Sequence, residues 1–98
     1  MIKINHIDIT GYIETLPKQV IINKELCCEF LFCACAWVKS GRIQEHFSIP
    51  VLVSRKHAKC CLQKQKGTHL RIQGCLSFNT AERRYTGFYI NAEKILYK

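Results

Sequence analysis

Two arginines beside a tyrosine form the strongest local cluster of chemically useful side chains in this sequence. Arg83, Arg84 and Tyr85 stand together in the polar segment 79–86, so that two guanidinium groups neighbour one aromatic ring. Single strands of nucleic acid are held by cations that follow the phosphates and by flat rings on which bases stack. The cluster therefore predicts a nucleic-acid contact, and the alternative interpretation is an ordinary solvated loop.

A second group of cations and rings lies between residues 37 and 46. Trp37 is a candidate platform for a base, with a subunit interface or partial burial as the alternative. Lys39 and Arg42 follow it in a basic turn, and His46 adds a smaller ring. Lys18, in an earlier turn, is a further candidate for a phosphate contact. These residue types all favour binding of a charged, base-bearing polymer.

The overall charge agrees with such a partner. Lysine and arginine number 15 against 7 aspartate and glutamate residues, which gives a formal net charge of +8 in 98 residues. A basic excess of this size favours polyanions, above all nucleic acid. Four lysines on or beside one predicted helix fit a solvated face or a docking surface for an acidic partner better than a DNA groove: Lys56, Lys59, Lys64 and Lys66.

Catalytic and metal-binding patterns do not stand out. The chain has no glycine-rich phosphate loop, nucleophile elbow or His-Glu-x-x-His motif, and its acidic residues are scattered. The seven cysteines form no Cys-x-x-Cys pair, and His57 with Cys60 and Cys61 makes only a partial set of zinc ligands. We therefore expect a non-enzymatic protein without metal or cofactor, whose cysteines are reduced and act as small hydrophobic residues.

The alternation of apolar and polar residues predicts the elements that position these groups. Five strands and one helix are expected. They cover Ile7–Ile13, Leu26–Val38, Ile43–Val53, Ser54–Lys66 (the helix), Thr68–Phe78 and Gly87–Tyr97. Three strands, a short helix and two strands are the order of the OB-fold, a small barrel that binds oligonucleotides on one face. We expect one all-β domain, with one short helix, over residues 1–98.

Several positions carry more specific expectations. Gly11 inside the first strand predicts a bend, a bulge or a close backbone approach. Leu16-Pro17-Lys18 breaks or redirects the chain. Pro50 predicts an edge or bulge position in its strand.

The helix has its own signals. Ser54 is placed at the N-cap and Gly67 just beyond the C-terminal end. Ala58, Cys61 and Leu62 form its apolar stripe.

Side-chain alternation also predicts which rings face outward. In the second strand Trp37 falls on the face opposite Phe30 and Phe32, away from the core. In the third strand only one of His46 and Phe47 can face the ligand, and we place His46 outward and Phe47 in the core.

Several stretches resemble a known superfamily. Asn5–Gly11 and Lys66–Gly74 resemble the first and fourth strands of bacterial single-stranded DNA-binding proteins. Within that superfamily, Cys28–Phe30, Pro50–Ser54 and Asn91–Ile95 resemble the PriB family, primosomal replication protein N. The resemblance covers nearly the whole chain. The family pattern places an aromatic residue at the position aligned with His46.

The resemblance implies a homodimeric OB-fold protein of replication restart. Such a protein binds single-stranded DNA, contacts the restart helicase PriA and other primosome proteins, and helps to reload the replication machinery. Alternatives are a general single-stranded DNA-binding protein without an acidic tail, a protein-interaction module and an RNA-binding domain. The start of the chain, Met1–His6, lacks a signal-peptide pattern, and no apolar run approaches the roughly 18 residues of a membrane span, so a cytoplasmic location is expected.

Overall fold

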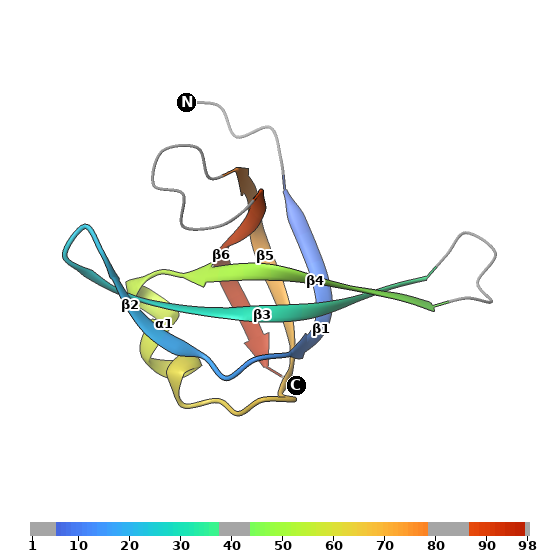
Figure 1. The fold of residues 1–98 in the computed structure, drawn as a ribbon, viewed down its shortest axis with the longest axis horizontal. Helices are drawn as coiled ribbons and strands as arrows, with labels where there is room; N and C mark the ends of the chain where they lie inside the picture. The colour runs from blue at the N-terminus through green and yellow to red at the C-terminus, as the bar shows by residue number, and fades with distance from the viewer. Residues whose placement is uncertain (1–5, 38–43, 79–86, 98) are drawn as a thin grey trace.

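The computed structural model describes residues 6–37, 44–78 and 87–97, which form six strands and one short helix (Figure 1). In chain order these are β1 (Ile7–Ile13), β2 (Lys18–Ile22), β3 (Glu25–Trp37), β4 (Gln44–Val53), α1 (Arg55–Leu62), β5 (His69–Phe78) and β6 (Phe88–Tyr97). Within this part of the chain, no helix is long and apolar enough to cross a membrane.

Five of the strands close into a barrel. The sheet order is β1-β5-β6-β4-β3-β2, and β1 also pairs with β3, which joins the two ends of the five-stranded part. Every pairing is antiparallel except that of β4 with β6, where Val51–Val53 run parallel to Ile90–Ala92. The predicted all-β OB-fold barrel with one short helix is confirmed. Its five strands are β1, β3, β4, β5 and β6.

The extra strand β2 was not predicted. It pairs with Glu25–Glu29 of β3, and β1 pairs with Phe32–Ala34 along the same edge. The two strands therefore follow one path, interrupted at residues 14–17. There the Leu31 carbonyl accepts a hydrogen bond from Glu14 N (2.8 Å), and Leu31 N donates to Thr15 Oγ1 (2.9 Å). The prolyl ring at Pro17 removes a donor, as predicted, but the strand resumes directly after it.

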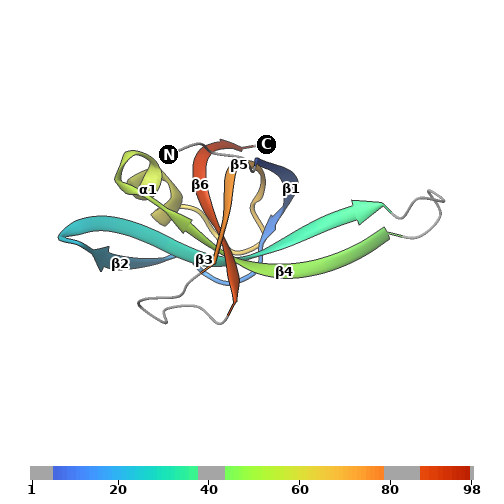
Figure 2. The same ribbon diagram turned by 90° about the horizontal axis from the view of Figure 1, so that it is seen from above.

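The ribbon of β3 and β4 continues past the barrel along the longest axis of the molecule, as both views show (Figures 1 and 2). Among the residues that the structure describes, the last part of β3, Cys35–Trp37, pairs with β4 alone. On its other edge β4 has a partner only from Val51 onward, within the described residues. Pro50 lies immediately before that point, so the predicted edge position is confirmed.

The barrel interior is filled by side chains of alternating strand residues, with α1 closing one side. The largest fully buried side chains are Phe32, Ile13, Leu70, Ile72, Ile90, Val51, Val53, Cys28 and Cys61. Ala58 and Cys61 of α1 are both fully buried in this cluster, and Leu62 packs against it. The predicted helical stripe is confirmed, and it is the face that packs chiefly against β3.

The helix is shorter than predicted. It ends at Leu62 rather than Lys66, and Gln63 is its C-cap. Gly67 therefore does not end the helix, contrary to the prediction. Its backbone has φ +91°, and its N–H donates to the Ile13 carbonyl (2.7 Å), so the glycine shapes the turn into β5. Ser54 does occupy the N-cap, but its hydroxyl makes no capping hydrogen bond.

Two glycines mark places where strands cross too closely for a side chain. A Cβ atom at Gly11 would overlap the carbonyl oxygen of Cys33, and one at Gly74 would overlap that of Asn91. Gly11 pairs with both β5 and β3, so it lies where β1 closes the barrel. Gly74 adjoins the register shift between β5 and β6. Of the three alternatives predicted at Gly11, a bend, a bulge or a close backbone approach, the structure shows the close approach.

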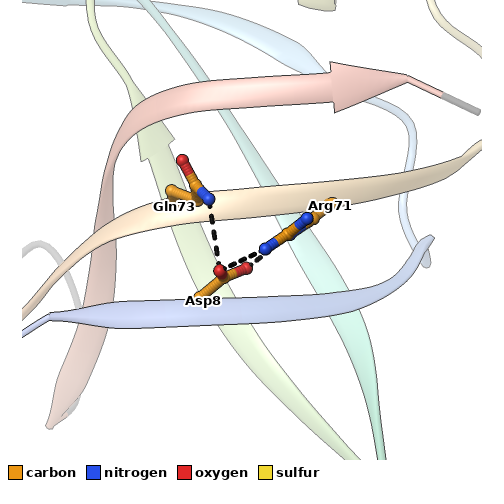
Figure 3. A network of polar contacts seen from close by, with 3 residues as sticks. All are labelled: Asp8, Arg71 and Gln73. Carbon is orange, nitrogen blue, oxygen red and sulfur yellow. Dashed lines mark hydrogen bonds and ion pairs between the residues drawn. The ribbon is translucent and has the colours of Figure 1, made fainter.

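A network of polar side chains ties β1 to β5 on the outer surface (Figure 3). Arg71 donates through Nε to Asp8 Oδ1 (2.7 Å) and through Nη2 to Asp8 Oδ2 (2.6 Å), and Gln73 Nε2 donates to Oδ2 (3.2 Å). The hydrogen bonds from Arg71, assisted by Gln73, lower the pKa of Asp8 from 3.8 to about 2. Arg71 is therefore engaged with Asp8 where β1 meets β5, and we call this junction the Asp8–Arg71 seam.

Replacement of Gly11 by alanine tests the barrel closure. The added methyl group must displace backbone rather than a movable side chain, so we expect the free energy of unfolding to fall by about 2 kcal/mol or more. Urea denaturation of Gly11→Ala measures this, with Gln19→Ala on exposed β2 as the control, which should stay within about 0.5 kcal/mol of wild type. Equal stability of Gly11→Ala and wild type would contradict the close crossing.

The Asp8 network predicts a loss of stability in acid. Because the folded pKa is lower than the ordinary value, the stabilising contribution is complete above pH 3.8 and is lost as the pH falls toward about 2. Denaturation at several pH values should show a steeper decline for wild type than for Asp8→Asn across this interval. Parallel pH profiles for the two proteins would show that the carboxylate gains nothing from folding.

Candidate nucleic-acid interface

The outer face of the β3–β4 ribbon is the candidate binding surface. Figure 1 looks onto this ribbon, with the rest of the barrel behind it. Opposite residues on β3 and β4 share a face of the ribbon, and the outer face includes the pairs Cys33 with Ser48 and Leu31 with Pro50. These strands correspond to the second and third predicted strands, which carry the candidate rings Trp37 and His46.

An open groove of about 430 Å³ lies on this side of the ribbon. It is lined by Thr15, Leu16, Lys18, Glu29, Phe30, Leu31 and Pro50. The groove follows from the interruption between β1 and β2, which leaves the edge of β3 next to Leu31 without a regular strand. Leu16 is 68% exposed beside it, so the groove offers apolar surface that no described residue covers fully. Its apolar lining suits the flat face of a base.

The charges around the groove are mixed. Lys18 has a side chain that is 73% exposed, with its Nζ 3.5 Å from Glu29 Oε1. Glu14 lies nearby and accepts a hydrogen bond from Ser48 Oγ (2.7 Å). The predicted site residue Lys18 is therefore at the groove, but one carboxylate partly offsets its charge. A bound phosphate chain needs further cations.

Two predicted rings lie on the part of the ribbon that extends beyond the barrel. His46 is exposed, as predicted, and its Nδ1 is 3.9 Å from the Cys33 Sγ. Trp37 is the last residue of β3 and pairs with Gln44 in the backbone register; its side chain lies outside the described structure. His46 and Trp37 thus lie on the extended part of the ribbon, whereas Lys18 lies on β2, beside Glu29 of β3.

The prediction that Phe47 belongs to the core is wrong. Phe47 has the same strand parity as buried Val51 and Val53, but its side chain is 47% exposed. The cause is the position of the residue, because at Phe47 the only described strand that pairs with β4 is β3, so this part of β4 lies beyond the described barrel. Both faces of the ribbon therefore present a ring to solvent here, at His46 and at Phe47.

The remaining predicted site residues lie outside the described part of the chain. They are Lys39, Arg42, Arg83, Arg84 and Tyr85. Their assignment to the interface stays a prediction, made from residue type and sequence position. Residues 38–43 follow the end of β3, and residues 79–86 connect β5 to β6.

Sequence reasoning missed an exposed aromatic pair next to that second connection. Phe78 and Phe88 are opposite each other at the ends of β5 and β6. Their ring centroids are 5.2 Å apart at 66°, an edge-to-face contact, yet the residues are 55% and 56% exposed. Figure 1 shows these strand ends rising past the β4 side of the ribbon. The sequence did offer a signal for this pair, because Phe78 and Phe88 flank the segment 79–86 that contains Arg83 and Arg84.

Four of the described cysteines are buried, whereas Cys60 is exposed and Cys75 is half-buried. Cys27, Cys28, Cys33 and Cys61 are buried free thiols, which confirms the prediction of small hydrophobic residues for these four. A hydrogen bond with Cys61, together with burial, raises the pKa of the Cys28 thiol far above its usual range. Across residues 6–37, 44–78 and 87–97, no group of three His, Cys, Asp or Glu residues could hold a metal ion.

Sequence comparisons do not assign this chain, whereas structural comparisons do identify relatives of the fold. No family model matches it, and no curated protein does. A small single-stranded DNA-binding protein from Streptomyces coelicolor superposes with a TM-score of 0.80 at 18% identity, covering 100% of this chain and 96% of its own. Two structures of PriB from Ralstonia solanacearum superpose with TM-scores of 0.78 and 0.79 at 16% identity.

The superposed regions are nearly complete on both sides. The two PriB matches cover 97% and 98% of this chain and 98% and 100% of the PriB chains. The chain is therefore similar to these proteins over its whole length, not only in a shared barrel core. At such low identity the likeness establishes the fold, and it agrees with the resemblance found in the sequence.

Proposed function

We propose that this protein binds single-stranded DNA along the outer face of the β3–β4 ribbon, as a non-enzymatic accessory factor of replication restart. The observation that carries the proposal is the open groove on that face, in a fold that matches a single-stranded DNA-binding protein along its full length. The net charge of +8 supports a polyanionic ligand. The likeness to PriB in sequence motifs and in fold supports the role in restart.

The proposed mechanism combines stacking with phosphate contacts. Bases stack on rings exposed around the ribbon, namely His46, Phe78 and Phe88 among the described residues and Trp37 by prediction. Lys18 contributes one cation at the groove. The other phosphate contacts are assigned to Lys39, Arg42, Arg83 and Arg84, with Tyr85 beside the arginines. Such binding is nearly independent of base sequence, because every base has a flat face and every nucleotide has a phosphate.

The wider role is proposed from the family resemblance. It includes a homodimer, contact with a PriA-like restart helicase and other primosome proteins, and a location in the cytoplasm. In this proposal residues 1–98 form a single OB-fold domain, and the barrel itself carries the DNA-binding surface. No reacting group is required, because the protein acts by holding a strand for its partners.

Fluorescence anisotropy of labelled oligothymidine at increasing salt tests the proposal. Each phosphate contact to a single strand contributes about 0.7 to the slope of log affinity against log salt, so Arg83→Ala with Arg84→Ala should reduce the slope by roughly 1.4.

Replacing Phe78 and Phe88 together by leucine should weaken binding roughly tenfold or more at all salt concentrations, because stacking is lost while charge is kept.

Leu96→Ala provides the control for the phenylalanine variant, since Leu96 is an exposed apolar residue on β6 that faces away from the barrel interior. It should bind like wild type. Duplex DNA should compete poorly. Absence of oligothymidine binding at low salt would refute the proposal, and preferential displacement by a matched RNA would assign the protein to RNA.

A further inference from the structure

Helix α1 presents a cationic surface that the proposed DNA path does not use. Figure 2 shows α1 on the side of the β3–β4 ribbon where β1 and β6 lie, away from the outer face of the ribbon. Along the helix, exposed positions recur at Lys56, Lys59, Cys60 and Gln63, the spacing of one helical face. The opposite face carries buried Ala58 and Cys61. The exposed lysines are therefore fixed in direction by the packing of the helix.

The two lysines line a hollow of about 630 Å³ between the helix and the start of β3. Its lining consists of Lys56, Lys59, Ser54 and Glu25. Among the described residues neither lysine forms an ion pair, so both ammonium groups are available to a ligand. We call this site, with those four lining residues, the helix hollow.

The segment that contains α1 is basic throughout, and Glu25 of β3 is the one carboxylate in the lining of the helix hollow. Residues 46–81 contain no aspartate or glutamate, and the stretch includes Lys56, Lys59, Lys64 and Lys66. Lys56 lies in the first turn of α1, where a cation opposes the helix dipole, whereas Lys59 lies in the last turn; the two lysines repel each other at a spacing of three residues. Ser54 adds no capping hydrogen bond in compensation. Departures from local stability rules of this kind are expected where a surface serves a partner.

We infer that the helix hollow binds an acidic, extended peptide segment of a partner protein. Lysine ammonium groups pair well with carboxylates carried on a flexible chain, and such pairing offsets the repulsion between Lys56 and Lys59. The inference concerns a different surface from the proposed DNA site. It does not depend on the proposed function.

A nucleic-acid strand fits this surface less well. Single-strand binding uses exposed rings, but the one ring on α1, the His57 imidazole, is half-buried, and Tyr97 on β6 is half-buried with Lys64 Nζ 4.4 Å from its ring centroid. The carboxylate of Glu25 lines the helix hollow and repels a continuous row of phosphates there. A peptide can place an uncharged residue opposite that carboxylate.

Anisotropy of a fluorescein-labelled peptide of alternating Asp and Ser tests this inference, with a peptide of alternating Asn and Ser as the uncharged control. Lys56→Gln with Lys59→Gln should weaken binding of the Asp peptide roughly fivefold or more. Lys94→Glu on exposed β6 changes the net charge by the same amount and should weaken it less than twofold. The Asn peptide should not bind measurably.

The same three proteins are titrated with labelled oligothymidine and with duplex DNA. The inference predicts that the helix variant keeps wild-type affinity for DNA. It is overturned if Lys94→Glu weakens peptide binding as much as the helix variant, since the attraction would then depend only on net charge. It is also overturned if the helix variant loses DNA affinity to the same extent, which would place DNA at α1. A failure of wild type to bind oligothymidine would refute the proposed function alone.

Discussion

The close crossing of β1 and β3 at Gly11 is the constraint on which the rest of the structure depends. The backbones approach so closely there that no side chain fits, and this contact closes the barrel. Closure separates an inner face, filled by residues such as Phe32 and Ile72, from an outer face, on which Ser48 is exposed and Leu31 is half-buried. Without it, the sheet would have two unprotected edges and no defined interior.

The groove is a consequence of the same geometry. Both β1 and β2 pair with the same edge of β3, β1 at the crossing and β2 farther along. The chain between them, residues 14–17, interrupts this pairing. The interruption leaves Leu31 and Pro50 open to solvent as the groove lining. At the end of β3 and the start of β4 the two strands extend beyond the barrel, and this exposes the rings of His46 and Phe47. Barrel closure and the candidate binding surface thus have one origin.

The sequence predicts well which side chains of a strand or helix face inward. It predicts poorly how far the barrel interior extends along each strand. Alternation identified the barrel strands, and the helical stripe at Ala58 and Cys61 identified the buried face of α1. Strand β2 escaped prediction because Val20–Ile22 is an unbroken apolar run after a proline. Phe47, Phe78 and Phe88 have the parity of core residues, but alternation does not reveal where the core ends. That boundary depends on which strands are neighbours, a property of the whole fold.

The central claim is that single-stranded DNA lies on the outer face of the β3–β4 ribbon, and nuclear magnetic resonance mapping tests it most directly. Backbone amide shifts are recorded for the isotope-labelled protein with and without oligothymidine. The account predicts the largest changes at Leu31, Ser48, Phe78 and Phe88, and small changes along α1 and at the Asp8–Arg71 seam. Changes concentrated on α1 or on that seam, with the ribbon unaffected, would contradict it.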